Sequence, residues 1–337
     1  MSKQSYANRV NSRRIIEGPS DSLMAVSPLK HKWAWDILDV MEANTWFARE
    51  IDLSRDIKDY NTVLTAAEKS MYDKALAFLS NLDGIQFNNL ISNIGQHITS
   101  PEVSMCVSRQ AWEEAVHVKA YSTMIEAIAL DPSVIYMTFE RDKVLAAKNE
   151  YIMQQSAILS NEYTSRNFAL AVVANVILEG IYFFSGFLAF YVLAKNGKML
   201  NSADMIRYIQ RDEEKTHLVL FVNIFHALKQ ERPELFDAEF YESARELFKT
   251  AVELECAWGR HIIKGGVLGV TDSIVNDYIR YLANERLAMI GMDPLYPGVK
   301  NPVAWVERFS EIDSVEANFF ESKPTSYAVG GTLEWDS

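Results

Sequence analysis

The stretch EEAVHVKAY, at residues 113–121, is the first of two that indicate the fold of this chain. It contains the pair Glu114 and His117, and the same Glu-x-x-His spacing returns within RDEEKTH at Glu214 and His217. On a helix, side chains three residues apart lie on one face, so each pair presents a carboxylate beside an imidazole. A single pair indicates little, because a solvated Glu beside a surface or capping His has the same spacing. The two pairs together become informative once other acids join them.

The rest of the chain also has the pattern of helices. Gly and Pro number only 14 and 9, and the apolar residues between them recur three and four apart. Thr65 and Glu68 form a capping box, and Ser100 with Pro101 opens the next helix. No stretch alternates in the manner of a strand, so we predict an all-α fold. Further helices are expected after Asp131, around Glu179 as far as Lys195, from near Asn201, after Pro233 and after Thr271.

Two more acids, Asp83 and Glu179, lie on helices of their own in apolar surroundings. An unpaired charge in such surroundings would be costly, so both acids need cations. Two helices that each give an acid, and two that each give Glu-x-x-His, form the ligand set of the dimetal-carboxylate bundles. Four carboxylates balance two divalent ions, and oxygen with imidazole suits iron or manganese. We therefore predict a ferritin-like bundle with a dimetal site in its core.

The segment from Phe168 to Ala194 is almost wholly apolar and resembles a membrane span in length. Glu179 lies within it, and a carboxylate in the middle of a lipid-exposed span costs about 2.5 to 3.5 kcal/mol. A buried core helix that carries one functional acid is the better interpretation, and no membrane association is expected.

Composition excludes several other classes of protein. The net charge is −12, so binding to nucleic acid through phosphates is not expected. Cys106 and Cys256 lie far apart and form no CxxC pair, and the polar N-terminus lacks the apolar run of a secretion signal. These features indicate the reducing cytoplasm.

Tyr121 lies four residues after His117, so a helix places its ring one turn further along on the metal side. This position makes the phenol an oxidisable neighbour of the predicted site, although a buried tyrosine can equally fill a core. Phe183 and Phe187 follow Glu179 by one and two turns. They would shield the site from water, or simply fill the core.

The strings DGIQ, EEAVHVKAY, LEGIYFF and RDEEKTH closely resemble the small subunit of class I ribonucleotide reductases, and the similarity continues through most of the chain. It includes KWAW near residue 33, WFAREIDLSRD from Trp46, NPVAW from Asn301, and Tyr327 with the glycines around it. The resemblance implies a protein that uses oxygen at two metal ions to generate a tyrosyl radical. That radical would pass to a large subunit for the reduction of ribonucleotides to deoxyribonucleotides.

The resemblance also assigns roles to individual residues. Tyr121 matches the tyrosine that stores the radical, and Trp46 and Tyr327 match the residues through which its oxidising equivalent leaves. Di-iron is the preferred cofactor, with di-manganese or mixed manganese and iron as alternatives. The implied ligands are Asp83, Glu114 and His117 for one metal, and Glu179, Glu214 and His217 for the other.

One departure from the family pattern leaves a choice open. The family reads Arg-Asp-Glu-x-x-His, whereas residues 211–217 contain one residue more. Helical spacing selects Glu214 as the ligand and leaves Glu213 where the family has an aspartate bonded to the other histidine. A π-bulge would instead deliver Glu213 to the metal and leave Asp212 in its usual role. We prefer Glu214.

Ribose reduction needs a nucleotide pocket and redox thiols, and this chain has neither paired cysteines nor a glycine-rich phosphate loop. The substrate must therefore bind to a partner, the large catalytic subunit, and members of the family are usually homodimers. We expect a flexible arm at residues 1–24, the helical domain at 25–307, and a tail at 308–337 that binds the large subunit.

Three rival functions use parts of the same sequence pattern. A ferritin is a shorter chain without such a tail. A ferritin-like ligand-binding oxidase would act on its own substrate in a cavity beside the metals. A metal-free helical scaffold would pair these acids with lysines.

Overall fold

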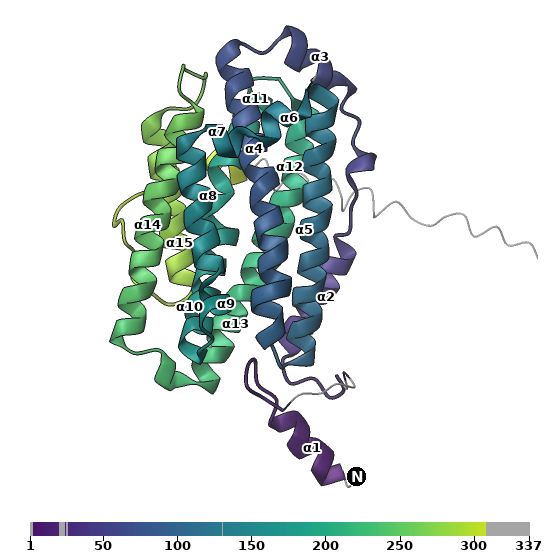
Figure 1. Ribbon diagram of the computed structural model, residues 1–337, viewed down its shortest axis with the longest axis vertical. Coiled ribbons are helices and arrows are strands. Elements are labelled where there is room, and N and C mark those ends of the chain that lie inside the picture. The colour runs from purple at the N-terminus through teal and green to yellow at the C-terminus, as the bar shows by residue number, and fades with distance from the viewer. Residues whose placement is uncertain (1–2, 20–23, 25, 130, 308–337) are drawn as a thin grey trace, which may run out of the picture. The chain divides into compact units, whose positions relative to one another are not determined.

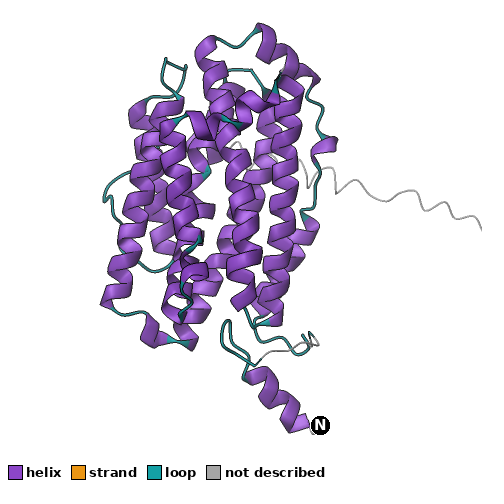
Figure 2. Cartoon of the chain, viewed as in Figure 1, coloured by secondary structure: helices purple, strands orange, loops and turns teal. Residues whose placement is uncertain are grey.

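The computed structural model describes residues 3–19, 24, 26–129 and 131–307 (Figure 1). Helices joined by loops make up this part of the chain, which contains no strand (Figure 2). The long helical segments are α4 (Ala66–Asn89), α5 (Pro101–Ile128), α10 (Ser165–Ile177), η4 (Leu178–Tyr182), α11 (Phe184–Lys195), α12 (Leu200–Asp212), η5 (Glu213–His217), α13 (Leu218–Glu231), α14 (Ala238–Ile262) and α15 (Asp272–Met289). The shorter ones are α1 (Lys3–Asn11), α2 (Lys32–Ala43), η1 (Ala48–Glu50), α3 (Ser54–Thr62), η2 (Leu90–Ile94), η3 (Gly95–His97), α6 (Pro132–Tyr136), α7 (Thr138–Arg141), α8 (Lys143–Ser156), α9 (Ile158–Asn161) and η6 (Pro233–Leu235).

The helices begin where the sequence places their caps. The Thr65 hydroxyl accepts the amide of Glu68, and the Glu68 carboxylate accepts the amide of Thr65 at 2.8 Å, which confirms the capping box of α4. The Ser100 hydroxyl caps α5, with Pro101 in the first turn. These caps satisfy amides that a helix leaves without partners, and they fix where α4 and α5 start.

The site is built from helices that lie along one another in the unit formed by residues 1–302. Helix α4 packs along α5 and α11, while α10 packs along α13 and α11 along α12 (Figure 1). This helical bundle buries large apolar side chains between its helices, among them Phe78, Phe168, Phe190 and Trp258. Of the second unit, residues 303–337, the structure describes residues 303–307.

The apolar segment that resembles a membrane span is a core helix. Residues Ser165–Lys195 are long and apolar enough to cross a membrane, but their most apolar window is completely buried. Glu179 lies in this segment and is fully buried as well. The expectation of a core helix that carries one acid is therefore confirmed.

Residues 13–18, within the predicted N-terminal arm, contact the helical bundle. Arg13 is buried and its guanidinium lies 3.4 Å from the Glu102 carboxylate, and the amide of Ile15 donates to Glu231 at 2.9 Å. The predicted boundaries after residues 24 and 307 stay predictions. The tail at 308–337, with Tyr327, lies outside the described residues.

Candidate metal centre

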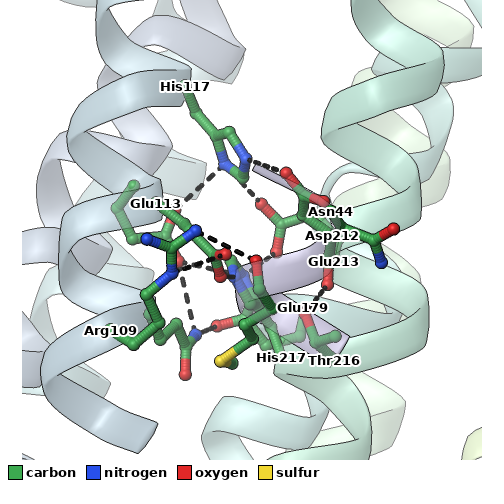
Figure 3. Close-up of polar contacts among 12 residues, drawn as sticks. Asn44, Arg109, Glu113, His117, Glu179, Asp212, Glu213, Thr216 and His217 are labelled. Carbon is green, nitrogen blue, oxygen red and sulfur yellow. Dashed lines mark hydrogen bonds and ion pairs between the residues drawn. The ribbon is translucent and has the colours of Figure 1, made fainter. Parts of the chain in front are cut away.

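Four segments deliver six ionisable side chains to one point in the core. Asp83 comes from α4, Glu114 and His117 from α5, Glu179 from η4, and Glu213 and His217 from η5; all are fully buried. Figure 3 shows His117, Glu179, Glu213 and His217 converging between these helices. Sequence segments more than a hundred residues apart therefore supply one cluster.

The cluster divides into two overlapping groups, each with donor atoms that lie within 4.8 Å of one another. Glu114 and Glu213 belong to both groups. This sharing is the arrangement expected when two carboxylates bridge a pair of cations. The first group consists of Asp83, Glu114, His117 and Glu213, and the second of Glu114, Glu179, Glu213 and His217.

The expectation that Glu214 joins this cluster is wrong. Residues Glu213–His217 form a π turn, in which hydrogen bonds span five residues rather than four. The wider turn brings Glu213, four residues before His217, onto the inner face. Glu214 points away, with its side chain 30% exposed and its carboxylate 3.2 Å from the Arg286 guanidinium. Asp212 then lies 3.3 Å from His117, as the π-bulge alternative requires.

The donor atoms fit metal ions because many of them have no hydrogen-bond partner and face only other members of the cluster. A buried polar atom without a hydrogen bond is costly, and here several converge on one point. A pair of divalent cations would satisfy them, and oxygen with imidazole donors suits iron or manganese. The atoms without a hydrogen-bond partner are both carboxylate oxygens of Asp83, Glu114 Oε2, His117 Nδ1, Glu179 Oε2 and Glu213 Oε1.

The electrostatics of the cluster also favour cations. Burial, and then the charge of Glu114, raises the pKa of Asp83 well above its ordinary value. Burial and the charge of Glu213 do the same to the pKa of Glu179. For Glu213, burial would raise the pKa, but the positive charge of His217 and hydrogen bonds lower it. Without metal the cluster therefore retains protons, which cations would replace.

Each histidine is oriented by an acid on its outer side. His217 Nε2 donates to Glu113 at 2.9 Å, and Glu113 in turn lies 3.1 Å from the Arg109 guanidinium (Figure 3). His117 Nε2 donates to Asp212 at 3.3 Å. In both rings this bond leaves Nδ1 facing the cluster; His217 Nδ1 lies 2.9 Å from Glu213 Oε2, and a metal would replace the proton on this nitrogen.

Amide side chains hold the carboxylates in the same way. The Gln110 amide donates to Glu179 at 2.7 Å and to Glu114 at 3.3 Å. The Gln86 amide also donates to Glu179, and it reaches Asn175 at 3.0 Å. These bonds leave Oε2 of Glu179 without a hydrogen-bond partner and 3.9 Å from His217 Nδ1 in the cluster.

Sequence reasoning missed Glu113 and Gln110. Gln110 precedes Glu114 by four residues, and Arg109 precedes Glu113 by four, so helical spacing offered a signal for both pairs. No spacing rule connects Glu113 with His217, because they lie on different helices. That contact depends on how the two helices are rotated against each other.

Tyr121 is fully buried, and its hydroxyl has no hydrogen-bond partner. Burial, followed by the charge of Asp83, raises the pKa of this phenol well above its ordinary value. Phe183 and Phe187 are buried and stack on each other at 5.7 Å. The phenol therefore stays protonated in a dry part of the core.

Trp46 connects the cluster with the surface. Its indole Nε1 donates to Asp212 at 2.7 Å, and its ring stacks on His117 with centroids 6.2 Å apart. Trp46 also stacks on Tyr208, with ring centroids 5.3 Å apart, and Tyr208 is 37% exposed. Tyr327, the second residue expected in the relay, lies outside the described part of the chain.

Comparisons of the sequence and of the fold with known proteins agree with one another. Residues 24–302 match the family model described as "Ribonucleotide reductase, small chain". The ribonucleoside-diphosphate reductase subunit beta of Treponema pallidum is 38% identical, over 96% of this chain and 93% of that protein. The corresponding subunit of Halalkalibacterium halodurans is 32% identical, over 93% and 91%. The solved ribonucleotide reductase R2 subunit from Clostridium botulinum superposes with a TM-score of 0.85 at 38% identity, covering 88% of this chain and 94% of that one.

Proposed function

This chain belongs to the ribonucleotide reductase small-chain family, and from that premise we propose that its cluster holds two metal ions that serve to generate a radical on Tyr121. It is a subunit of ribonucleoside-diphosphate reductase, an oxidoreductase of deoxyribonucleotide synthesis. When bound, the metal pair supplies oxidising power drawn from dioxygen.

The convergence of unsatisfied buried donors carries this proposal. Glu114 and Glu213, which belong to both donor groups, would hold both ions. Asp83 and His117 would complete the ligands of one ion, and Glu179 and His217 those of the other. We propose two iron ions. Two manganese ions or a mixed pair are the alternatives, because oxygen and imidazole donors suit both metals.

Tyr121 is suited to store the radical because its surroundings keep it neutral and dry. Oxidation of this phenol to a neutral radical removes one electron and one proton, which the oxidised metal site and its carboxylates would take up. Its hydroxyl has no hydrogen-bond partner, and the side chain is fully buried, so reductants in water do not reach it. These properties would lengthen the lifetime of a radical formed there.

Trp46 is placed to pass the oxidising equivalent outward. Its indole touches both the His117 ring and the Asp212 carboxylate, which could take up the indole proton. A large subunit is the implied partner of a small subunit. We propose that the tail at residues 308–337 binds the large subunit and that Tyr327 is the next residue in the radical-transfer relay. We also propose that the small subunit is a cytoplasmic homodimer.

Electron paramagnetic resonance of the reconstituted protein tests the radical. Aerobic addition of ferrous or manganous ion should produce a phenoxyl signal in the wild type, and Tyr121→Phe should abolish it. Tyr72→Phe is the matched control, since Tyr72 is also fully buried but hydrogen bonds to Ser202 away from the cluster. A phenoxyl signal that persists in Tyr121→Phe would reassign the radical. Wild-type protein that binds no metal would support the scaffold function instead.

A second measurement tests the relay separately. Tyr327→Phe should leave the radical signal intact and remove nucleotide reduction in the presence of the large subunit. Nucleotide reduction that survives this substitution would contradict the role of Tyr327 without affecting that of Tyr121.

A further inference from the structure

Arg286, on α15, reaches into the core beside both π turns of the metal centre. Only 7% of the residue is exposed. Its Nε donates to the backbone carbonyl of Gly180 in η4 at 3.3 Å, and its Nη2 donates to the Glu214 carboxylate in η5 at 3.2 Å. One guanidinium thus connects two segments that the sequence separates by more than thirty residues.

The approach of Arg286 to η4 depends on the glycine at position 180. A Cβ atom there would lie 2.8 Å from Arg286 Cγ and 3.0 Å from its Nε, closer than side-chain carbons normally come. The guanidinium also lies over the Phe184 ring, with its Cζ 5.4 Å from the ring centroid. The arginine is therefore held in one position by contacts on several sides.

Each bond of Arg286 falls on the residue that directly follows a proposed ligand. Gly180 follows Glu179, and Glu214 follows Glu213. Movement of either π turn would rotate the preceding acid with it. The amide of Gln210 also donates to Glu214 at 3.4 Å, which holds the Glu214 carboxylate on the outer side of η5.

The π turn of η5 competes with an ordinary α-helical turn. In an α-helix Glu214, three residues before His217, would share its face and enter the cluster in place of Glu213. The bond from Arg286 to the Glu214 carboxylate opposes that rotation, because Arg286 lies on the side away from the cluster. Arg286 could therefore decide which of two adjacent glutamates meets the metals.

We propose that Arg286 is a positioning residue that holds Glu179 and Glu213 toward the metal pair and keeps Glu214 out. This inference rests on the proposed function, because it requires the cluster to bind two ions. Outer residues that orient metal ligands affect affinity by about 10- to 100-fold when they are replaced. Arg286 acts on two ligands at once, so its loss should fall within that range.

Anaerobic titration of the metal-free protein with manganous ion tests the proposal. Paramagnetic resonance separates coupled manganese pairs from single ions, and calorimetry gives the affinity. Arg286→Gln should weaken manganese binding by about 10- to 100-fold and convert the coupled signal into that of single ions. Arg280→Gln is the matched control, because Arg280 lies on the same helix with a side chain that is 43% exposed.

A second control separates an effect on metal binding from a general loss of stability. Ile279→Ala removes a fully buried side chain from α15 and should lower the unfolding free energy without changing the coupled signal. If Arg286→Gln does not fold, Arg286→Lys retains the charge but cannot reach Gly180 and Glu214 together, and it should also weaken binding. If the Arg286 variants bind manganese as tightly as Arg280→Gln does and give the same coupled signal, the inference is wrong and the proposed function stands. Wild-type protein without coupled pairs would overturn both.

Discussion

The adjacent acids Glu213 and Glu214 allow a sharp test of the metal centre, because they differ in position and hardly in chemistry. Glu213 is fully buried and belongs to both donor groups, whereas Glu214 is partly exposed and pairs with Arg286. Glu213→Gln exchanges a charged carboxylate shared by both donor groups for a neutral amide while it keeps the size of the side chain. Glu214→Gln makes the same change outside the cluster.

The expected magnitudes follow from these positions. Loss of an outer partner of a metal ligand lowers affinity by about 10- to 100-fold. Loss of a carboxylate that belongs to both donor groups would leave three negative charges against two divalent ions, so Glu213→Gln should weaken binding by more than about 100-fold. Glu214→Gln keeps an amide oxygen that can still accept the hydrogen bond from Arg286, so it removes only the charge of a partly exposed ion pair, worth about 0 to 1 kcal/mol. Its loss therefore corresponds to less than about fivefold in affinity, since 1.4 kcal/mol is tenfold.

The assay is anaerobic titration with ferrous or manganous ion in competition with a chelator, followed by elemental analysis of the washed protein. Glu214→Gln should retain the wild-type metal content, and Glu213→Gln should lose it. The reverse result would show that residues 213–217 adopt an α-helical turn in the metal-bound protein. It would refute the reasoning from the π turn.

Two further predictions concern buried charges outside the cluster. Burial would lower the pKa of His31, but hydrogen bonds to Glu102 and Glu231 raise it above its ordinary value of 6.5. The contribution of His31 to the free energy of unfolding is therefore fully present below pH 6.5, and it is lost as the pH rises through the pKa of the folded protein. Urea unfolding should therefore show a larger difference between wild type and His31→Gln in acid than in alkali, and a difference that grows with pH would contradict this sign. Lys148 forms a buried ion pair with Glu255, and Lys148→Met should lower the unfolding free energy by about 3 to 5 kcal/mol because it leaves the acid unpaired. Adding Glu255→Gln should restore much of that loss, and a double variant no more stable than Lys148→Met would show that the pair itself stabilises the fold.

Several features of this protein followed from local sequence rules. Helix caps act within one turn of helix, so neighbouring residues were enough to predict them. Examples are the capping box at Thr65 and Glu68 and the proline at the start of α5. The apolar segment around Glu179 predicted a core helix because an isolated acid in it is costly in a lipid environment. The types of donor in the cluster could be predicted for the same reason, since buried acids need cations.

The choice between Glu213 and Glu214 was decided only by the tertiary structure. Helical spacing favoured Glu214, whereas the structure places Glu213 inside, because a π turn and an arginine from a distant helix set the rotation of this segment. The contact between Glu113 and His217 likewise joins two helices whose packing no local rule specifies. Residue types and helical periods are properties of the chain alone. The rotation of each helix about its axis depends on its neighbours in the bundle, and that rotation determines which acid meets the cluster.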